Sequence, residues 1–229
     1  MLLQETHINI NCKEVRQHYT IFFSADEKRS SKTTEAWVAI MVANKHLHTI
    51  SQIIPVDDRI MAVELKGAAT VSFINVYMYT STNWGLNKQR YKTLKDVTHR
   101  ANKKGPTYTA GDFNARIQEE QQSDVKVTGK FYFDRHNSNT AIDLNEGKEE
   151  NRAQLIGHCI DTKQVVLNTT FDKPDSKLVT WRHAKTKPED PLARYRPGSA
   201  GTYETLDYWL IPQRWKNSGK TANRTCTRI

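Results

Sequence analysis

The chain has 229 residues, which is enough to bury a substantial core in one large α/β or two-sheet domain. Its 34 lysines and arginines outnumber 25 aspartates and glutamates, and the formal charge of +9 favours a polyanionic partner, nucleic acid before a membrane. The longest apolar run, residues 36–43, is too short to span a bilayer, and the first residues do not resemble a secretory signal.

The cysteines indicate reduced thiols. They are odd in number and far apart in the sequence, and their spacing does not match a metal site: Cys12, Cys159 and Cys226. An intracellular compartment is the simplest account of such thiols.

The first third of the chain predicts a glutamate at the end of a strand and then several strands. Glu5 follows a short apolar start, where it is either a functional acid or an ordinary exposed glutamate. The continuous apolar run Trp37–Val42 predicts a strand covered on both faces. Three further β-type runs at short intervals predict an antiparallel meander: Ile50–Val56, Ile60–Leu65 and Thr70–Tyr77.

The last of these runs brings polar side chains to the end of a predicted strand. Asn75 and Tyr77 are two residues apart and therefore point to the same side of an extended backbone. A tyrosine in this place is either a core residue with its hydroxyl at the surface or a functional group. Apolar residues then recur at helical spacing in Lys88–Lys103, which predicts an amphipathic helix that Gly105 and Pro106 end.

The segment Gly111–Asn114 is the centre of the predicted site. It follows a β-prone run without charges, and therefore indicates a buried strand that opens into a loop, where α/β sheets place their chemistry. Asp112 and Asn114 would share one side, with Phe113 in the core. Gly111 would leave room for a close-approaching ligand. A carboxylate beside an amide suits a phosphate held near a divalent cation, and an ordinary Asp/Asn turn is the alternative.

The second half predicts one helix and three strands. The helix is expected over Asn151–Lys163, after a polar, loop-rich segment from 116 to 150. The strands are expected over these ranges: Val165–Thr170, Leu178–Arg182 and Thr205–Ile211. In the last strand, Asp207 is flanked by large apolar residues, which is costly for a carboxylate without a partner.

Two basic segments lie near the end of the sequence. The stretch from 185 to 201 carries four cations, Lys185, Lys187, Arg194 and Arg196, and is either a solvated loop or a contact to a phosphate backbone. Residues 212–229 contain no acid. We expect one domain over residues 1–218 and a disordered basic tail over residues 219–229.

Five motifs in this order resemble the endonuclease/exonuclease/phosphatase superfamily, and most closely the apurinic-like endonuclease domains of non-LTR retrotransposons. The similarity extends from Leu3 to about Ser218. It implies an α/β (α+β) fold, a two-sheet β-sandwich flanked by helices in four layers, of the deoxyribonuclease I type. The motifs are Leu3–Thr6, Asn75–Tyr77 with Thr80 and Ser81 after it, Gly111–Asn114, Thr180–Trp181 and Leu206–Tyr208.

The resemblance also implies roles for individual residues. Glu5 would be the metal ligand, with Mg²⁺ or Mn²⁺ as the cofactor. The catalytic residues would be Tyr77 at the scissile phosphate, Asp112 at the attacking water, Asn114 at the phosphate, and Asp207 orienting a histidine. Substrate binding is expected for Asn75, Thr180 and Trp181, which belong to these motifs. It is also expected for Arg194 and Arg196, because of the basic character of their loop.

The implied function is metal-dependent hydrolysis of phosphodiesters by a DNA-nicking endonuclease. DNA would be the partner, the location would be nuclear, and neither a membrane nor an obligate protein partner is expected. In the family, an Asn-Val strand begins the domain and Ser-Asp-His ends it. All eight histidines of this chain precede Asp207, and Tyr79 stands where proline is usual, so we expect a domain that is incomplete at both termini.

Three functions agree with these observations. The first is a nicking endonuclease that is weak or inactive in this chain, because the closing histidine is absent. The second is a phosphoesterase of the same superfamily for small or lipid phosphates. The third is a nucleic-acid binder without catalysis, or the product of a decaying pseudogene.

Overall fold

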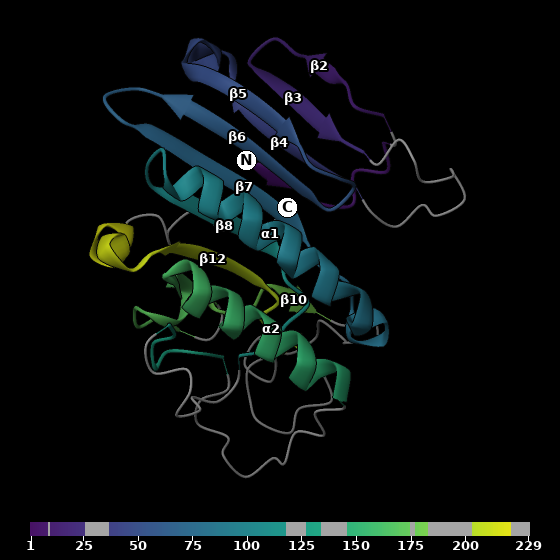
Figure 1. The fold of residues 1–229 in the computed structure, drawn as a ribbon, viewed down its shortest axis with the longest axis vertical. Helices are drawn as coiled ribbons and strands as arrows, with labels where there is room; N and C mark the ends of the chain where they lie inside the picture. Colours follow the sequence, from purple (N-terminus) through teal and green to yellow (C-terminus); the bar gives the residue numbers. More distant parts are fainter. Residues whose placement is uncertain are drawn as a thin grey trace. The chain divides into compact units, whose positions relative to one another are not determined.

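A computed structural model describes residues 1–8, 10–25, 37–117, 127–133, 146–174, 177–182 and 203–220. The chain forms two compact units (Figure 1). Unit 1 comprises Met1–Met78 and Gln89–Phe113, and unit 2 comprises Tyr79–Lys88 and Asn114–Ile229. Among the described residues, no helix has the length and apolar character that crossing a membrane requires.

Unit 1 contains two groups of strands. The first sheet is antiparallel, with the order β1 (Leu2–Leu3), β4 (Val38–Ala43), β3 (Tyr19–Ser24) and β2 (Lys13–Val15). The second group has the order β5 (Ile50–Pro55), β6 (Ile60–Lys66), β7 (Thr70–Tyr77) and β8 (Thr107–Asp112). Strands β5, β6 and β7 form an antiparallel meander, and β8 lies parallel to β7.

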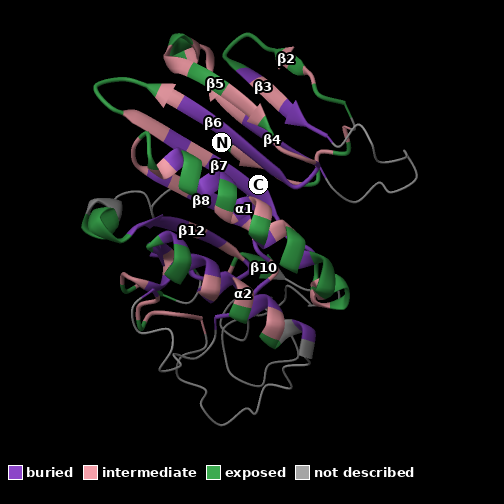
Figure 2. Ribbon diagram, in the orientation of Figure 1, coloured by how far each residue is buried: buried purple, intermediate pink, exposed green. Residues whose placement is uncertain are grey.

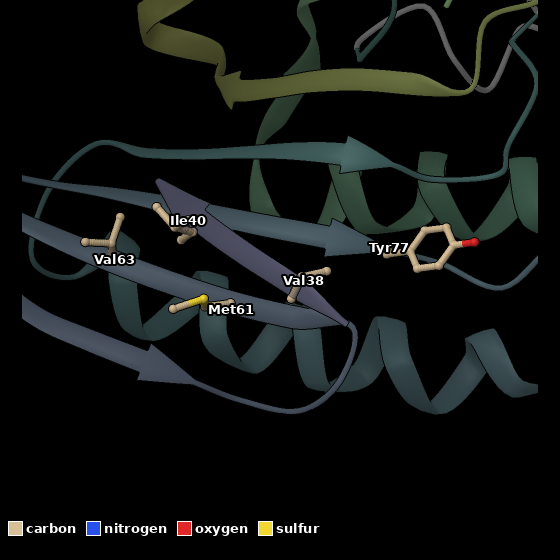
Figure 3. Close-up of a cluster of buried hydrophobic side chains, with 5 residues drawn as sticks. All are labelled: Val38, Ile40, Met61, Val63 and Tyr77. Carbon is tan, nitrogen blue, oxygen red and sulfur yellow. The ribbon is translucent and has the colours of Figure 1, made fainter. Parts of the chain in front are cut away.

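The two groups of strands share an apolar core. Val38 and Ile40 of β4 pack against Met61 and Val63 of β6, together with Tyr77 of β7 (Figure 3). All five side chains are less than a tenth exposed. The first three residues of β4 are buried in succession, as expected for a strand covered on both faces, whereas Met41, Val42 and Ala43 are partly exposed.

The helix α1 (Asn87–Asn102) leads from β7 to the parallel strand β8. Its apolar residues are buried, as the helical spacing predicts: Tyr91, Leu94, Val97 and Ala101. At the return to the sheet, a Cβ on Gly105 would overlap the carbonyl oxygen of Thr70. Glycine therefore allows β8 to begin close beside β7.

Unit 2 contains one long helix and short strands. Helix α2 (Glu146–Thr162) leads to β9 (Gln164–Val166), which pairs antiparallel with β12 (Asp207–Pro212). Strands β10 (Trp181–Arg182) and β11 (Tyr203–Glu204) form a second antiparallel pair. Among the described residues, 3-10 helices include η1 (Asn44–Thr49) in unit 1 and η2 (Ser81–Leu86), η3 (Leu167–Thr169) and η6 (Gln213–Lys220) in unit 2.

The structure confirms the two-sheet α/β sandwich with flanking helices, the meander and both helices, although α2 begins five residues before the predicted start. The strand predicted over Val165–Thr170 is wrong after Val166, where the hydroxyl of Thr169 donates to the carbonyl of Val166 and the chain turns into η3. Of the strand predicted over Leu178–Arg182, only the last two residues form a strand, β10, which pairs with β11. Strands β2 and β3 were not predicted. The single domain over residues 1–218 and the missing termini stay predictions, and residues 221–229 of the tail lie outside the described residues.

Candidate active site

Two predicted site residues from distant parts of the sequence meet in unit 1. The hydroxyl of Tyr77, the last residue of β7, donates a hydrogen bond to Oε1 of Glu5, at 2.7 Å. Figure 3 shows the oxygen of Tyr77 pointing away from the four other labelled side chains of the core. The ring of Tyr77 is therefore part of the core, while its hydroxyl is available to the chemistry of a site.

Asn75 fixes the segment that carries Glu5. Its side chain is fully buried, and its amide nitrogen donates to the carbonyl of Leu3 at 2.8 Å and to that of Ala39 at 2.9 Å. Its amide oxygen accepts a hydrogen bond from the side chain of Gln4. The substrate contact expected for Asn75 stays a prediction, and the observed contacts give this residue a positioning role beside Glu5.

The backbone at Glu5 is strained. Its φ of 55° lies in the left-handed region, which costs a residue with a side chain about 1–3 kcal/mol. The next residue is held by a hydrogen bond from the N–H of Thr6 to the carbonyl of Trp37, at 3.2 Å. The strained conformation is thus held by a hydrogen bond to the residue that precedes β4. In this conformation the carboxylate of Glu5 reaches the hydroxyl of Tyr77.

Asp112 ends β8 directly beside the end of β7. In the parallel register Asp112 is opposite Tyr77, and the carbonyl of Asp112 accepts a hydrogen bond from the N–H of Met78 at 2.8 Å. The next residue, Phe113, is fully buried, which confirms its predicted place in the core. Unit 1 therefore brings Glu5, Tyr77 and Asp112 together, and these are three of the residues that the sequence predicts for the site.

Gly111 lies against the backbone of β7 and not against an open space for a ligand. Its φ is 143°, and a Cβ at this position would overlap the carbonyl oxygen of Val76 in β7. The expectation that the glycine leaves room for a ligand is corrected by this contact, because the approaching group is the backbone of the neighbouring strand. The glycine allows the two strand ends, and with them Asp112 and Tyr77, to lie close together.

The environment of Tyr77 keeps its hydroxyl protonated. Burial raises the pKa of this side chain most, and the hydrogen bond to Glu5 and the negative charges of Glu5 and Asp112 raise the pKa further. The hydroxyl is consequently a hydrogen-bond donor throughout the neutral range. Two carboxylates and a donor in one place can position water and hold a phosphate oxygen.

Arg59 is a residue of this site that the sequence analysis did not identify. Its guanidinium lies 4.8 Å from the centroid of the Tyr77 ring and donates to the carbonyl of Tyr77 at 3.2 Å. The only sequence signal was the charged group Asp57–Arg59 between two apolar strands, which is also typical of an ordinary turn.

An ion-pair cluster fixes the turn that carries Arg59. Arg90 of α1 pairs with Asp57 and, at 3.0 Å, with Asp58. Oδ1 of Asp57 accepts hydrogen bonds from the N–H groups of Arg59 at 2.7 Å and Ile60 at 2.8 Å. Burial raises the pKa of Asp57, although the charge of Arg90 opposes this shift. Helix α1 therefore stabilises the turn beneath Tyr77.

In unit 2, Asn114 is part of a network of buried amides. Its φ is 46°, and its carbonyl accepts a hydrogen bond from the side chain of Asn151 at 2.9 Å. Asn151 also donates to the carbonyl of Tyr79 and accepts from the side chain of Asn87 at 2.8 Å. Asn87 in turn binds both the N–H and the carbonyl of Tyr79. The two helical asparagines were not predicted, because their polar partners are distant in the sequence.

Asp207 is held through its backbone at the start of β12. Oγ1 of Thr180 accepts from the N–H groups of Leu206 at 3.0 Å and Asp207 at 3.1 Å. Asn168, which was not predicted, donates to the carbonyl of Asp207 at 3.2 Å. Asp207 is partly exposed, which lowers the cost of a carboxylate between apolar neighbours. These bonds give Thr180 a structural role at β12.

The remaining predicted residues are placed only in part. Trp181 is 37% exposed and begins β10. Arg194 and Arg196, together with the rest of the predicted basic loop, lie outside the described residues. Substrate binding by these three residues stays a prediction.

The donor set in unit 1 fits a magnesium ion that retains water. Within the described ranges there is no group of three or more His, Cys, Asp or Glu side chains arranged to hold a metal. Mg²⁺ is commonly held by only one or two carboxylates, with waters and substrate phosphate as its other ligands. Glu5 and Asp112, whose charges both act on Tyr77, are suited to that arrangement.

Solved structures share the architecture described above. The AP endonuclease LMAP from Leishmania major is 14% identical, with a TM-score of 0.56, and the match covers 94% of this chain and 70% of that chain. The 3′ phosphatase NExo from Neisseria, bound to a product DNA hairpin, is 13% identical with a TM-score of 0.55, and covers 94% of this chain and 77% of that one. The chain thus shares the fold of these two enzymes, in agreement with the two-sheet sandwich that the resemblance implies.

Among curated proteins, the chain is similar to Craniofacial development protein 2 of Bos taurus, with 25% identity over 169 residues, or 72% of this chain. The chain spans about a quarter (24%) of the length of that relative. No protein-family model matches the chain.

Proposed function

We propose that the chain is a metal-dependent phosphodiesterase that nicks DNA. The observation that carries the proposal is the meeting of Glu5, Tyr77 and Asp112, with the hydroxyl of Tyr77 bound to Glu5 at 2.7 Å. The charge of +9 supports a polyanionic substrate. The DNA hairpin in the structure of the Neisseria phosphatase supports DNA as that substrate.

The chemistry follows from the protonation of these groups. Glu5 and Asp112 would hold Mg²⁺ or Mn²⁺, which offsets the charge of the phosphate and acidifies bound water. The hydroxyl of Tyr77 has one proton and donates one hydrogen bond at a time. When the substrate binds, a phosphate oxygen replaces Glu5 as the acceptor of that bond. The carboxylate of Asp112 accepts a hydrogen bond from the attacking water and orients it.

The residues of unit 2 receive their roles from the resemblance. Asn114 donates its side-chain amide to a phosphate oxygen, and Asp207 serves to orient a catalytic base. The same motifs favour a relationship with the endonucleases of non-LTR retrotransposons, and therefore a nuclear location.

A supercoiled-plasmid assay with Mg²⁺ or Mn²⁺ tests the proposal. The parent should convert supercoiled plasmid to the nicked form, and Asp112→Ala should not. Asp172→Ala removes an exposed carboxylate of unit 2 and is the matched control, which should nick as the parent does. A folded parent that binds DNA without nicking it would contradict the proposal.

The second candidate function is DNA binding without catalysis. It is favoured by one observation, namely the formal charge of +9, which attracts a polyanion whether or not a reaction follows. Salt-dependent binding without metal-dependent nicking would identify this function.

A further inference from the structure

We propose that the exposed face of α1 is a second contact surface for the phosphate backbone of duplex DNA, separate from the candidate active site. This basic stripe consists of Lys92, Lys95, His99, Arg100 and Lys103, the last of which follows directly after the helix. All of them except Lys95, which is partly exposed, are exposed residues. This proposal rests on the proposed function in one respect, namely that the bound polyanion is DNA.

The basic stripe and the buried face occupy opposite sides of one helix. Lys92, Lys95, His99 and Lys103 recur at intervals of three and four residues, and therefore lie along one side. Between them recur the buried residues Leu94, Val97 and Ala101. Figure 2 shows the resulting alternation of exposed and buried turns along α1.

The length of the stripe suits a DNA strand. Eleven residue intervals separate Lys92 from Lys103, which corresponds to about 16 Å at the helical rise of about 1.5 Å per residue. One strand of duplex DNA has a phosphate about every 3.4 Å along its axis. The stripe can therefore run beside about five phosphates.

Helix stability does not explain the stripe. Like charges three or four residues apart, as at Lys92 and Lys95, destabilise an isolated helix slightly. The helix dipole favours cations only in the last turn, which accounts for His99 and Arg100 but not for the two lysines before them. Asp96, four residues from both Lys92 and Arg100, is the one acid in the helix, so cations outnumber acids within α1.

One further cation extends the surface beyond the helix. Gly105 packs directly against the backbone of Thr70, and Thr70 is opposite Lys66 in the register of β6 and β7. Lys66 is exposed and is therefore a further cation one strand away from the residue that Gly105 contacts. The neighbouring Lys104 differs, because its ammonium group pairs with the buried Glu64 at 2.8 Å.

The Lys103 end of the stripe is distant from the reacting groups of unit 1. Thr70, which Gly105 contacts, and Tyr77 are the two ends of β7, and seven intervals of about 3.3 Å separate them by about 23 Å. The Lys92 end is nearer to them, because Arg90 pairs with Asp57 and Asp58 in the turn that carries Arg59. None of the stripe residues is a reacting group, so their removal should reduce affinity more than the rate of the chemical step.

The test compares two variants that each lose three positive charges. The first, Lys92→Gln, Lys95→Gln, Lys103→Gln, removes lysines of the stripe and keeps good helix formers. The control, Lys13→Gln, Lys45→Gln, Lys177→Gln, removes exposed lysines elsewhere. Binding to a fluorescein-labelled 25-bp duplex is measured by anisotropy in EDTA, from 50 to 200 mM NaCl. Circular dichroism confirms that both variants fold.

The stripe variant should bind more weakly, and its slope of log K against log salt should be smaller by about one for each lysine that contacts a phosphate. The control should keep the slope of the parent. Equal slopes for the two variants, or no binding by the parent, would overturn the inference. Plasmid nicking by the parent separates this inference from the proposed function. If the parent nicks DNA and the two variants have equal salt slopes, only the DNA contact of the stripe is refuted. If the slope of the stripe variant falls and the parent does not nick, only the proposed catalysis is refuted.

Discussion

The hydroxyl of Tyr77 and Oε1 of Glu5 are 2.7 Å apart, although 72 residues separate them in the sequence. The hydrogen bond joins the end of a central strand to the segment after an edge strand. It also joins the residue that the proposal assigns to the phosphate with the residue that it assigns to the metal. A substitution at either residue should therefore change both the proposed binding of metal and phosphate and the protonation of the remaining partner.

Tyr77→Phe should reduce plasmid nicking by about 10²-fold, because one donor to the transition state is lost. The fold should persist, since the ring stays in the core. Tyr19→Phe removes the hydroxyl of an exposed tyrosine of β3 and should have no effect. Initial rates of nicking at equal folded protein concentration provide the measurement. Unchanged rates in Tyr77→Phe would remove Tyr77 from the mechanism.

The raised pKa of Tyr77 predicts its behaviour in alkali. At pH 11 the absorbance of tyrosinate near 295 nm should be equal for the folded parent and folded Tyr77→Phe, because Tyr77 stays protonated. In guanidinium chloride the unfolded parent should show one more ionised tyrosine than unfolded Tyr77→Phe, whereas the buried Tyr208 ionises on unfolding in both proteins. The folded state holds this proton more tightly than the unfolded chain, so the contribution of Tyr77 to the free energy of unfolding is complete below about pH 10 and falls above it.

Asn75→Ala should lower the free energy of unfolding by about 2–4 kcal/mol, because it leaves the buried carbonyls of Leu3 and Ala39 without this donor. Urea unfolding followed by circular dichroism gives the value. Gln52→Ala, at an exposed position in β5, should change it by less than about 0.5 kcal/mol. A similarly small change in Asn75→Ala would show that the amide does not hold the Glu5 segment.

Gly111→Ala should destabilise the protein by about 2–5 kcal/mol, since the added methyl group meets the carbonyl of Val76 and the φ of 143° disfavours a side chain. Gly85→Ala is the matched control, because a Cβ there has no neighbour within 4 Å. The measurement is the thermal unfolding midpoint of each variant, and that of Gly111→Ala should be the lower one. Equal midpoints would mean that β7 and β8 do not approach as closely as described.

Local patterns in the sequence were sufficient for most of the fold. The meander β5–β7 follows from short β-type runs with turns between them, and α1 from apolar residues at helical spacing. Strands β2 and β3 were missed because their residues are of mixed polarity, with β2 largely exposed at the edge of its sheet. The end of β9 was missed because hydroxyl groups of threonine favour a turn there, although threonine is also common in strands.

The candidate site was predictable where a motif marks it, and not where distant contacts create it. Glu5, Tyr77 and Asp112 were found from their motifs. The role of Gly111 was misjudged, because the group that approaches it belongs to β7 and is 35 residues away in the sequence. Arg59, Asn87 and Asn151 carry no motif at all. Their partners become neighbours only after the chain has folded.

Among the described residues, the two-residue strand β1 pairs with β4 alone, at Leu2 and Leu3. A short edge strand of this kind can detach by local unfolding at a much smaller free energy than global denaturation requires. Detachment would carry Glu5 away from Tyr77 while the central strands remain intact. The fraction of molecules with an assembled carboxylate is therefore set by the opening equilibrium of β1, which hydrogen exchange at its amides reports.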